Sequence, residues 1–342
     1  MTSLPVLQTS YQVLHDMTAG PIRSRLLMAG IELGVFDELE TFRAATAVAA
    51  AIGAHAGNTE RLLNALVMVG LLEKRAGRFR NSPVAQAYLM RSSATFLGPF
   101  LDLVDTICVT SLDDLCERVK HGPATPSPET DFSAEALWAE VTRASAGWVK
   151  GFVGPQVAAI VAGLPEFPAF RRMLDLGGGH GLFALYFVEA HPNMTAVVFD
   201  RPAVLAVAEN FAGEYALQDR VSMMAGDYLT DAIGSGYDFI WACSTLNFAR
   251  HDLDPLITKI HEALNPGGVF ISFQDGLTHE RTWPAVMLGH LGDMLRTGRD
   301  LAFDQGEIGA AALRCGFRSV HSRTIELPMG AMDMDVARKN SF

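Results

Sequence analysis

An amide, Asn247, and an imidazole, His251, lie in the segment STLNFARHD, between Ser244 and Asp252. This segment directly follows the apolar run YDFIWAC, which has the composition of a buried strand. Ligands in open α/β sheets bind at the carboxyl ends of strands, so we expect this turn to line a site. A histidine accepts a proton near neutral pH, whereas an amide does not. Asn247 and His251 are therefore the candidate catalytic residues, and only His251 can act as a base.

A glycine-rich turn gives the strongest signal for a bound cofactor. An apolar strand, a glycine turn and a helix follow one another in MLDLGGGHGLFALYF. The glycines let the backbone approach a ligand and present its N–H groups. Asp175, Gly177, Gly179 and Gly181 form the pattern D-x-G-x-G-x-G, whereas a dinucleotide fingerprint would require glycine at Leu182. S-adenosylmethionine has no pyrophosphate, and we predict that the turn binds this cofactor through Asp175, Gly177 and Gly179.

Two more carboxylates follow the next two predicted strands. Asp200 ends TAVVFD, where an acid accepts from ribose hydroxyls, and Asp227 lies in VSMMAGDYL, where it could accept from the adenine amine. An aspartate at such a position is also a common helix cap. The ordered series of signals at successive strand ends favours a cofactor site, to which we also assign Tyr228 and Ser244. His180 is interpreted as a turn residue and not as a base.

The pattern of elements around these motifs predicts the fold class. Over residues 166–342, apolar strands alternate with amphipathic helices, which predicts an α/β domain with a parallel, Rossmann-like sheet. Residues 1–110 are mostly helical with two short extended pieces, as in a winged helix. Residues 111–165 are predicted to be a helical linker and pocket-lining segment. The proline-rich stretch at residues 121–132 within it is expected to be a linker or surface loop.

Composition limits the classes of partner. The chain has 342 residues, of which 49% are hydrophobic, enough for two domains with sizeable cores. Its formal net charge of -11 argues against general affinity for nucleic acid or anionic membranes. The helix that would enter a DNA groove, TERLLNALVMVGLLE, carries Arg61 as its only basic residue. We therefore expect a small-molecule substrate and no nucleic-acid or membrane partner.

Cysteine usage and the N-terminal segment indicate the compartment. The 4 cysteines form no CxxC pair and have no metal-like spacing to histidines, so no metal site is predicted. The N-terminus lacks the basic and apolar regions of a secretory signal, and no apolar run approaches the ~18 residues of a membrane span. We expect a cytoplasmic protein.

Seven motifs together resemble those of one enzyme family. They are LDLGGGHG, FDRP, GDYL, HEALNPGGVFISF, DQGEIGAAALRCGF and, near the N-terminus, GIELGVFDEL and TERLLNALVMVGLLE. They are similar to motifs of the plant-type S-adenosylmethionine-dependent O-methyltransferases, which include the caffeic acid and acetylserotonin enzymes. The resemblance covers nearly the whole chain. It implies a class I methyltransferase domain and a winged-helix-like dimerisation domain, through which a homodimer forms and helps to roof the partner's pocket.

The chain departs from this family where the family removes a proton. The family carries a His-Asp pair after the fourth strand, and its histidine position falls here on Asn247 or Leu246. Its supporting glutamates fall on Gln274 and near Ala302. A phenol has a pKa of ~10 and needs a base to become a good nucleophile at neutral pH. The resemblance therefore implies the scaffold without the usual base.

Three explanations remain open. His251 could take the place of the missing histidine, or Asp275 could act as the base, although strand alternation points it away from Gln274. Alternatively the acceptor is a thioether, which has a lone pair and no proton to lose, so that alignment and desolvation suffice. The third explanation favours S-methylation of a thioether carboxylic acid such as 4-methylthio-2-hydroxybutyrate. It resembles what is expected of the bacterial methylthiohydroxybutyrate S-methyltransferases of dimethylsulfoniopropionate synthesis.

The other functions are O-methylation of a small aromatic hydroxyl with His251 as base, and a catalytically idle relative that only binds S-adenosylmethionine. For the substrate we assign contacts from two predicted helices. Arg143 and Trp148 precede the Rossmann-like domain, and His290 and Met294 lie in PAVMLGHLGDML.

Overall fold

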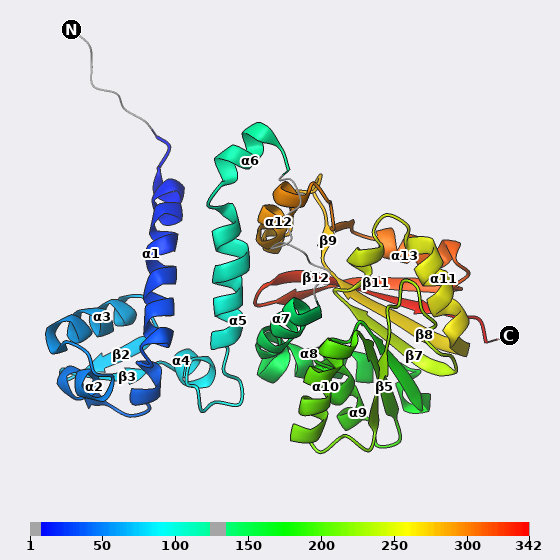
Figure 1. Cartoon of the computed structure of the whole chain (residues 1–342), viewed down its shortest axis with the longest axis horizontal. Coiled ribbons are helices and arrows are strands. Elements are labelled where there is room, and N and C mark those ends of the chain that lie inside the picture. Colours follow the sequence, from blue (N-terminus) through cyan, green and yellow to red (C-terminus); the bar gives the residue numbers. More distant parts are fainter. Residues whose placement is uncertain (1–7, 124–134, 342) are drawn as a thin grey trace, which may run out of the picture. The chain divides into compact units, whose positions relative to one another are not determined.

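A computed structural model describes residues 8–123 and 135–341 of the chain. Most of the expected loop at residues 121–132 lies outside the described residues. The chain forms two compact units, which meet in sequence between Asp102 and Leu103. Figure 1 shows the small unit in blue to cyan and the larger one from blue-green to red.

The first unit combines short helices with a small antiparallel sheet in the order β1-β3-β2. The hairpin between β2 and β3 turns through Ala76 and Gly77, both with positive φ (47° and 76°), as tight two-residue hairpin turns require. This arrangement agrees with the winged-helix-like prediction. Its elements are α1 (Gln12–Glu32), η1 (Phe36–Glu38), β1 (Arg43–Ala44), α2 (Ala45–Ala51), α3 (Ala56–Met68), β2 (Leu72–Arg75), β3 (Arg78–Asn81) and α4 (Pro83–Tyr88).

The helices of the first unit differ in what they bury. Helix α3 sends Leu63 and Leu66 into the unit's own core, where they meet Phe36 and Phe79. Helix α1 instead leaves most of its length exposed within the chain. The large apolar side chains that it and the residue before it expose are Tyr11, Val13, Leu14, Met17 and Ile22, each at least 59% exposed. Such a row of exposed apolar side chains is typical of a surface that another chain covers.

The second unit is built on a seven-stranded sheet in the order β11-β12-β8-β7-β4-β5-β6. The strands from β4 to β8 run parallel, and β12 joins them antiparallel. This topology confirms the predicted α/β Rossmann-like fold. Its strands are β4 (Arg172–Leu176), β5 (Thr195–Asp200), β6 (Val221–Ala225), β7 (Tyr237–Cys243), β8 (Leu264–Gln274), β11 (Ser319–Leu327) and β12 (Gly330–Arg338). Strands β5 and β6 extend the sheet on one side of β4, and β7 and β8 extend it on the other. The switch point, where such sheets bind their ligands, therefore lies between β4 and β7.

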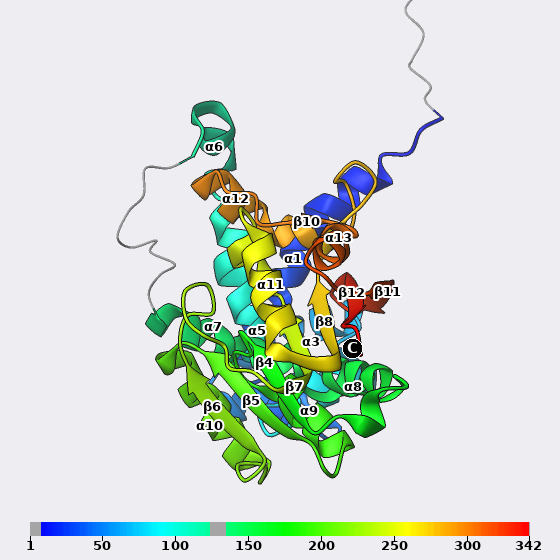
Figure 2. The same ribbon diagram turned by 90° about the vertical axis from the view of Figure 1, so that its right-hand side faces the viewer.

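Helices cover both faces of this sheet (Figure 2). One layer contains α8 (Gly154–Ala162), α9 (Leu182–Ala190) and α10 (Pro202–Glu214), and the other contains α11 (Leu253–Ala263) and α13 (Glu307–Arg314). Strand β7 alternates between the layers: Phe239 and Trp241 enter the first core, and Ile240 enters the second. This period of two residues is the direct consequence of the pleat.

Several shorter elements lie near the carboxyl ends of the strands or lead to them. Helices α7 (Glu135–Trp148), η5 (Val149–Val153), η8 (Ala285–His290) and α12 (Leu291–Thr297) belong to this group, as do η7 (Leu246–Ala249) and the strands β9 (Gly276–Leu277) and β10 (Phe303–Asp304). The chain reaches them through α5 (Gly98–Leu103), η2 (Val104–Val109), η3 (Thr110–Leu112) and α6 (Leu115–His121), and η6 (Phe167–Ala169) precedes β4. Within residues 8–123 and 135–341, none of the helices has the length and apolar character needed to cross a membrane.

Trp241 is the residue whose truncation should most weaken the larger unit. It is fully buried, and its ring centroid lies 5.0 Å from that of Phe187 and 5.1 Å from that of Phe183. We expect Trp241→Ala to lower the free energy of unfolding by about 3–5 kcal/mol in urea titrations, because it leaves a large cavity.

Trp241→Phe is the matched control. The indole Nε1 has no hydrogen-bond partner among the described residues, so phenylalanine keeps most of the volume and removes an unsatisfied donor. We expect it to cost less than about 1.5 kcal/mol. Equal losses for the two variants would contradict this account of the core.

Candidate active site

The glycine turn after β4 packs closely against the turn that follows β7. Gly177, Gly179 and Gly181 have φ values of 62°, 56° and 69°, which favour glycine. A Cβ at Gly177 would lie 2.1 Å from Oγ1 of Thr245, in the turn after β7. The backbone of the turn therefore packs directly against the neighbouring strand end, and a side chain at Gly177 has no room.

His180 belongs to the frame of this turn. Its Nδ1 accepts the N–H of Leu182 at 3.2 Å, in the first turn of α9. Burial, with a smaller contribution from the charge of Lys150, lowers the pKa of His180 to about 4. The imidazole is therefore neutral at physiological pH and acts as a local hydrogen-bond acceptor.

Asp175 is a buried carboxylate below the glycine turn. It is 2% exposed, and the N–H of Ala184 in α9 donates to it. Burial, reinforced by the charge of Asp200, raises the pKa of Asp175 to about 7. Its Oδ2 has no hydrogen-bond partner among the described residues. An unsatisfied acceptor at this position fits a ligand that brings a cationic or N–H group, as the amino acid part of S-adenosylmethionine does.

Asp200 and Asp227 lie at the ends of β5 and β6, as predicted, and both also make local hydrogen bonds. Asp200 Oδ2 accepts the N–H of Gly179 at 2.9 Å, which ties the end of β5 to the glycine turn. Asp227 Oδ1 accepts the N–H of Leu229 at 2.9 Å and closes the turn that follows β6. These hydrogen bonds stabilise the turns themselves, and the roles of both carboxylates in cofactor binding stay predictions.

Tyr228 connects two turns of the site. Its buried hydroxyl lies 2.7 Å from Oγ1 of Thr245 and donates to the Thr245 carbonyl at 2.9 Å. Burial raises the pKa of Tyr228, so the hydroxyl remains protonated. Ser244, exposed and with φ of 48°, donates its backbone N–H to Phe273 at the end of β8 (3.0 Å). We did not predict Thr245; the sequence signal was its position directly after the buried strand.

No base stands at the position where the resemblance implies a histidine. Leu246 is fully buried, and the amide nitrogen of Asn247, in the orientation that satisfies its surroundings, donates to the carbonyls of Ser244 and Thr245 at 3.3 Å each. Asn247 thus stabilises its own turn. His251 is exposed, and the described residues give its side chain no hydrogen bond or ion pair.

Three of the four predicted substrate contacts have local partners or lie partly buried. Arg143 is exposed and pairs with Glu140 of the same helix at 2.7 Å, so binding a substrate carboxylate would require exchange of that partner. Trp148 packs edge-on against Phe183, with ring centroids 6.0 Å apart, beside the core. Met294 is partly buried on α12. These roles in substrate binding stay predictions.

His290, the fourth predicted substrate contact, is paired with Asp275. Its Nε2 lies 3.7 Å from Oδ2 of Asp275, directly after β8. The nearby Asp275 carboxylate raises the pKa of His290 above its ordinary value. The pairing was not predicted because it depends on the path of the loop between β8 and η8.

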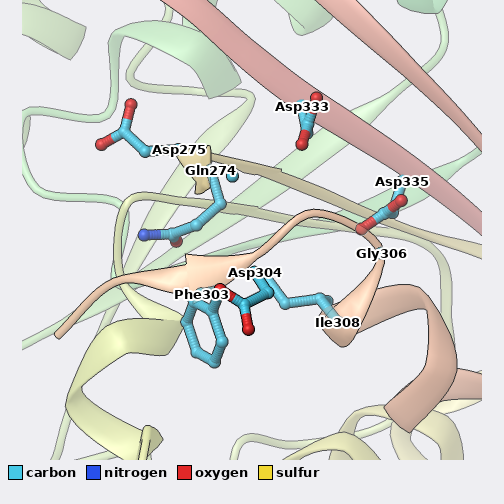
Figure 3. A pocket seen from close by; sticks show the side chains of 9 residues that line it. Gln274, Asp275, Phe303, Asp304, Gly306, Ile308, Asp333 and Asp335 are labelled. Atoms are coloured by element: carbon cyan, nitrogen blue, oxygen red, sulfur yellow. The ribbon is translucent and has the colours of Figure 1, made fainter. Parts of the chain in front are cut away.

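Gln274 and its neighbour Asp275 both line a small pocket at the end of β8. Phe303, Ile308, Asp333 and Asp335 also line it. Figure 3 shows Asp275 turned away from the two carboxylates of β12. Gln274 Oε1 and Asp333 Oδ2 have no hydrogen-bond partners among the described residues, and burial raises the pKa of Asp335. In the described part of the chain, no group of three or more histidine, cysteine or acidic side chains is placed to hold a metal ion.

Comparison with protein families finds two domain models on this chain. Residues 155–286 match the O-methyltransferase domain, and residues 16–91 match the O-methyltransferase dimerisation domain. The second match covers most of the small unit, and the first covers the strands from β4 to β8.

Individual proteins match over most of their length. The tetracenomycin polyketide synthesis 8-O-methyl transferase of Streptomyces glaucescens is 26% identical over 89% of this chain and 91% of its own. The 3-hydroxy-5-methyl-1-naphthoate 3-O-methyltransferase of Streptomyces sahachiroi is 28% identical over 76% of this chain and 75% of its own. The structure of human N-acetylserotonin methyltransferase in complex with SAM superposes with a TM-score of 0.79, at 24% identity, covering 98% of this chain and 100% of that one.

Asp227 offers a test of the predicted cofactor contacts. We expect Asp227→Ala to weaken binding of S-adenosylmethionine by about 1–3 kcal/mol, because it removes a charged acceptor. Isothermal titration calorimetry measures the loss.

Asp227→Asn separates the ligand contact from the turn. Asparagine keeps an oxygen for the N–H of Leu229 but places an amide nitrogen where the second carboxylate oxygen was. We expect it to lose affinity as well. An asparagine variant that binds as tightly as the wild type would mean that Asp227 only closes its turn.

Proposed function

We propose that this chain, on which an O-methyltransferase domain and an O-methyltransferase dimerisation domain both match, methylates a hydroxyl group of a small aromatic molecule. S-adenosylmethionine is the methyl donor. The observation that best supports the proposal is the close packing of Gly177 against Thr245, because it places the glycine turn directly beside the turn after β7. The hydroxyl acceptor is supported by the names of relatives that methylate oxygen, one of them on a naphthoate.

In the proposal, different residues of the chain bind the cofactor and shield the reactants from water. When bound, S-adenosylmethionine supplies a methyl group on a sulfonium centre that is already electrophilic, so the protein mainly aligns and desolvates the reactants. In the proposal, Asp175, Asp200 and Asp227 hold the polar parts of the cofactor. Thr142 of α7 lies within van der Waals distance (3.5 Å) of a Cβ placed at Gly179, so α7 covers the glycine turn and limits access of water.

S-methylation of a thioether acid such as 4-methylthio-2-hydroxybutyrate is the second candidate, and Asn247 favours it. The amide is held by backbone carbonyls at the position where relatives need a base, and a thioether has no proton to remove. This is the subtype expected of the enzymes of dimethylsulfoniopropionate synthesis. It also needs a partner for the substrate carboxylate, and Arg143 would first have to leave Glu140.

A panel of acceptors distinguishes the candidates. We expect purified protein to transfer labelled methyl from S-adenosylmethionine to hydroxylated aromatics, with a rate that rises as pH rises and the proton acceptor becomes unprotonated. Product mass and NMR identify the methylated atom. Turnover of methylthio acids alone, at a rate that does not change with pH, would instead identify a thioether as the methyl acceptor. Tight cofactor binding without turnover of either class would point to a catalytically idle relative.

A homodimer through the dimerisation domain is part of the proposal. The exposed apolar side chains of α1 support it, because burying them against a second copy would remove a large apolar surface from water. Light scattering at micromolar concentration should give twice the chain mass of 37.0 kDa.

Two variants of α1 sharpen this prediction. Met17 is 69% exposed, and we expect Met17→Glu to shift the protein towards monomer by placing a charge in the interface. Gln12→Glu adds the same charge at an exposed polar position of the same helix and should leave the mass unchanged. A wild type that scatters as a monomer would refute the homodimer.

A further inference from the structure

We propose that His290, held by Asp275, accepts the proton of the acceptor hydroxyl, in place of the base that is missing after β7. The inference rests on the proposed O-methylation. Neither residue occupies a position where the resemblance implies a catalytic group, and the two are 15 residues apart in the sequence. The loop between β8 and α12 brings them together.

The register of the sheet places Asp275 beside the other turns of the site. Cys243 at the end of β7 pairs with Phe273 of β8, and the N–H of Ser244 donates to the Phe273 carbonyl. Asp275 follows two residues later, at the same edge of the sheet as the turn that contains Asn247. Since Thr245 of that turn touches Gly177, the ends of β4, β7 and β8 form one continuous edge. A proton acceptor above β8 is therefore close to an acceptor molecule that faces the cofactor turn.

The exposure of the two side chains fits their proposed roles. The carboxylate side chain of Asp275 is 17% exposed, whereas that of His290 is 51% exposed. The enclosed carboxylate can orient the ring, and the ring can reach a molecule that enters from solvent. With Nε2 towards Asp275, the Nδ1 lone pair is available for a proton, and the described residues show no hydrogen bond to Nδ1. A carboxylate that fixes the tautomer of a histidine base is a recurrent catalytic arrangement.

The two carboxylates near His290, those of Asp275 and Asp293, both raise its pKa. Asp275 contributes most to raising its pKa, and Asp293, one turn along α12, adds to the effect. Asp293 is itself paired with Arg296 at 2.5 Å, which reduces its influence. The raised pKa means that the base form of His290 is lost as pH falls, starting above the ordinary histidine value of about 6.5.

Helix η2 and strand β12 also pack against η8. Helix η2 carries Asp105 and Cys108, and burial raises the pKa of the Cys108 thiol, so the thiol stays neutral. Strand β12 meets η8 through Gly330 and Val286, which carry no charge. Arg338 at the far end of β12 is paired with Glu166 at 2.6 Å, so no unpaired cation of these two described elements offsets Asp275.

The proposed step balances in atoms and charge. The acceptor oxygen forms a bond with the methyl carbon while its O–H bond breaks and the proton passes to Nδ1 of His290. The carbon–sulfur bond of the donor breaks with its electron pair left on sulfur. The positive charge of the sulfonium is thereby replaced by that of an imidazolium, which the carboxylate of Asp275 stabilises. Loss of this proton to solvent returns the histidine to its base form.

The test compares His290→Gln with His321→Gln, a matched change at an exposed histidine of β11. With a hydroxylated aromatic that the wild type methylates, we expect His290→Gln to lower kcat by about 100-fold or more and to remove the limb of the pH profile above 6.5. His321→Gln should keep both. Calorimetric binding of S-adenosylmethionine to His290→Gln should match the wild type, which shows that the variant is folded.

Asp275→Asn provides a readout that does not depend on turnover. In NMR titrations of the full-length protein, the imidazole signal that is missing in His290→Gln should titrate at lower pH in Asp275→Asn, because the neighbouring negative charge is gone. An unchanged titration would overturn the pairing.

The outcomes separate this inference from the proposed function. Hydroxyl methylation that persists in His290→Gln with the wild-type pH profile would overturn the role of His290 alone. Loss of the pH limb in His251→Gln, and not in His290→Gln, would likewise overturn the role of His290. A wild type that methylates only thioethers would overturn the proposed function and this inference together.

Discussion

The contact of Gly177 with Thr245 is the constraint on which the site depends, because it allows the turn after β4 to lie directly on the turn after β7. The hydroxyl of Tyr228 holds Thr245 from the other side, and Asp200 binds the backbone of Gly179. The ends of four strands, β4, β5, β6 and β7, are thereby joined by one close approach and two hydrogen bonds. A ligand that enters this edge meets a frame that is already formed, so little ordering is needed when it binds.

Burial of charge is the second constraint on this frame. Asp175 lies under the turn with one oxygen unsatisfied, and Asp333 and Asp335 lie behind Gln274 without a described ion pair. Polar groups in such positions are costly unless a partner or a proton compensates them. A cationic ligand would compensate the unsatisfied oxygen of Asp175. The stability of the ligand-free protein is therefore linked to the charge of the molecule that it binds.

The motifs predicted the fold and the conformation of the glycine turn because both depend on local patterns. Alternation of apolar strands and helices specifies the sheet, and the spacing of Gly177, Gly179 and Gly181 specifies the turn. Contacts between distant segments were harder to predict. Thr245 and the pair of His290 with Asp275 depend on sheet register and on the path of a loop, neither of which leaves a periodic signal. The ion pair of Arg143 with Glu140 depends on side-chain conformation and was equally invisible.

The buried carboxylates also change how the charge of the molecule should be understood. The formal net charge of -11 counts every aspartate and glutamate as ionised. The pKa of Asp175 is raised to about 7, so this buried group keeps part of a proton near neutral pH that the formal count removes. The folded chain is therefore slightly less negative than its composition suggests. A cationic ligand that ionises Asp175 on binding would release a proton to the buffer, so the measured heat of binding depends on the ionisation enthalpy of the buffer.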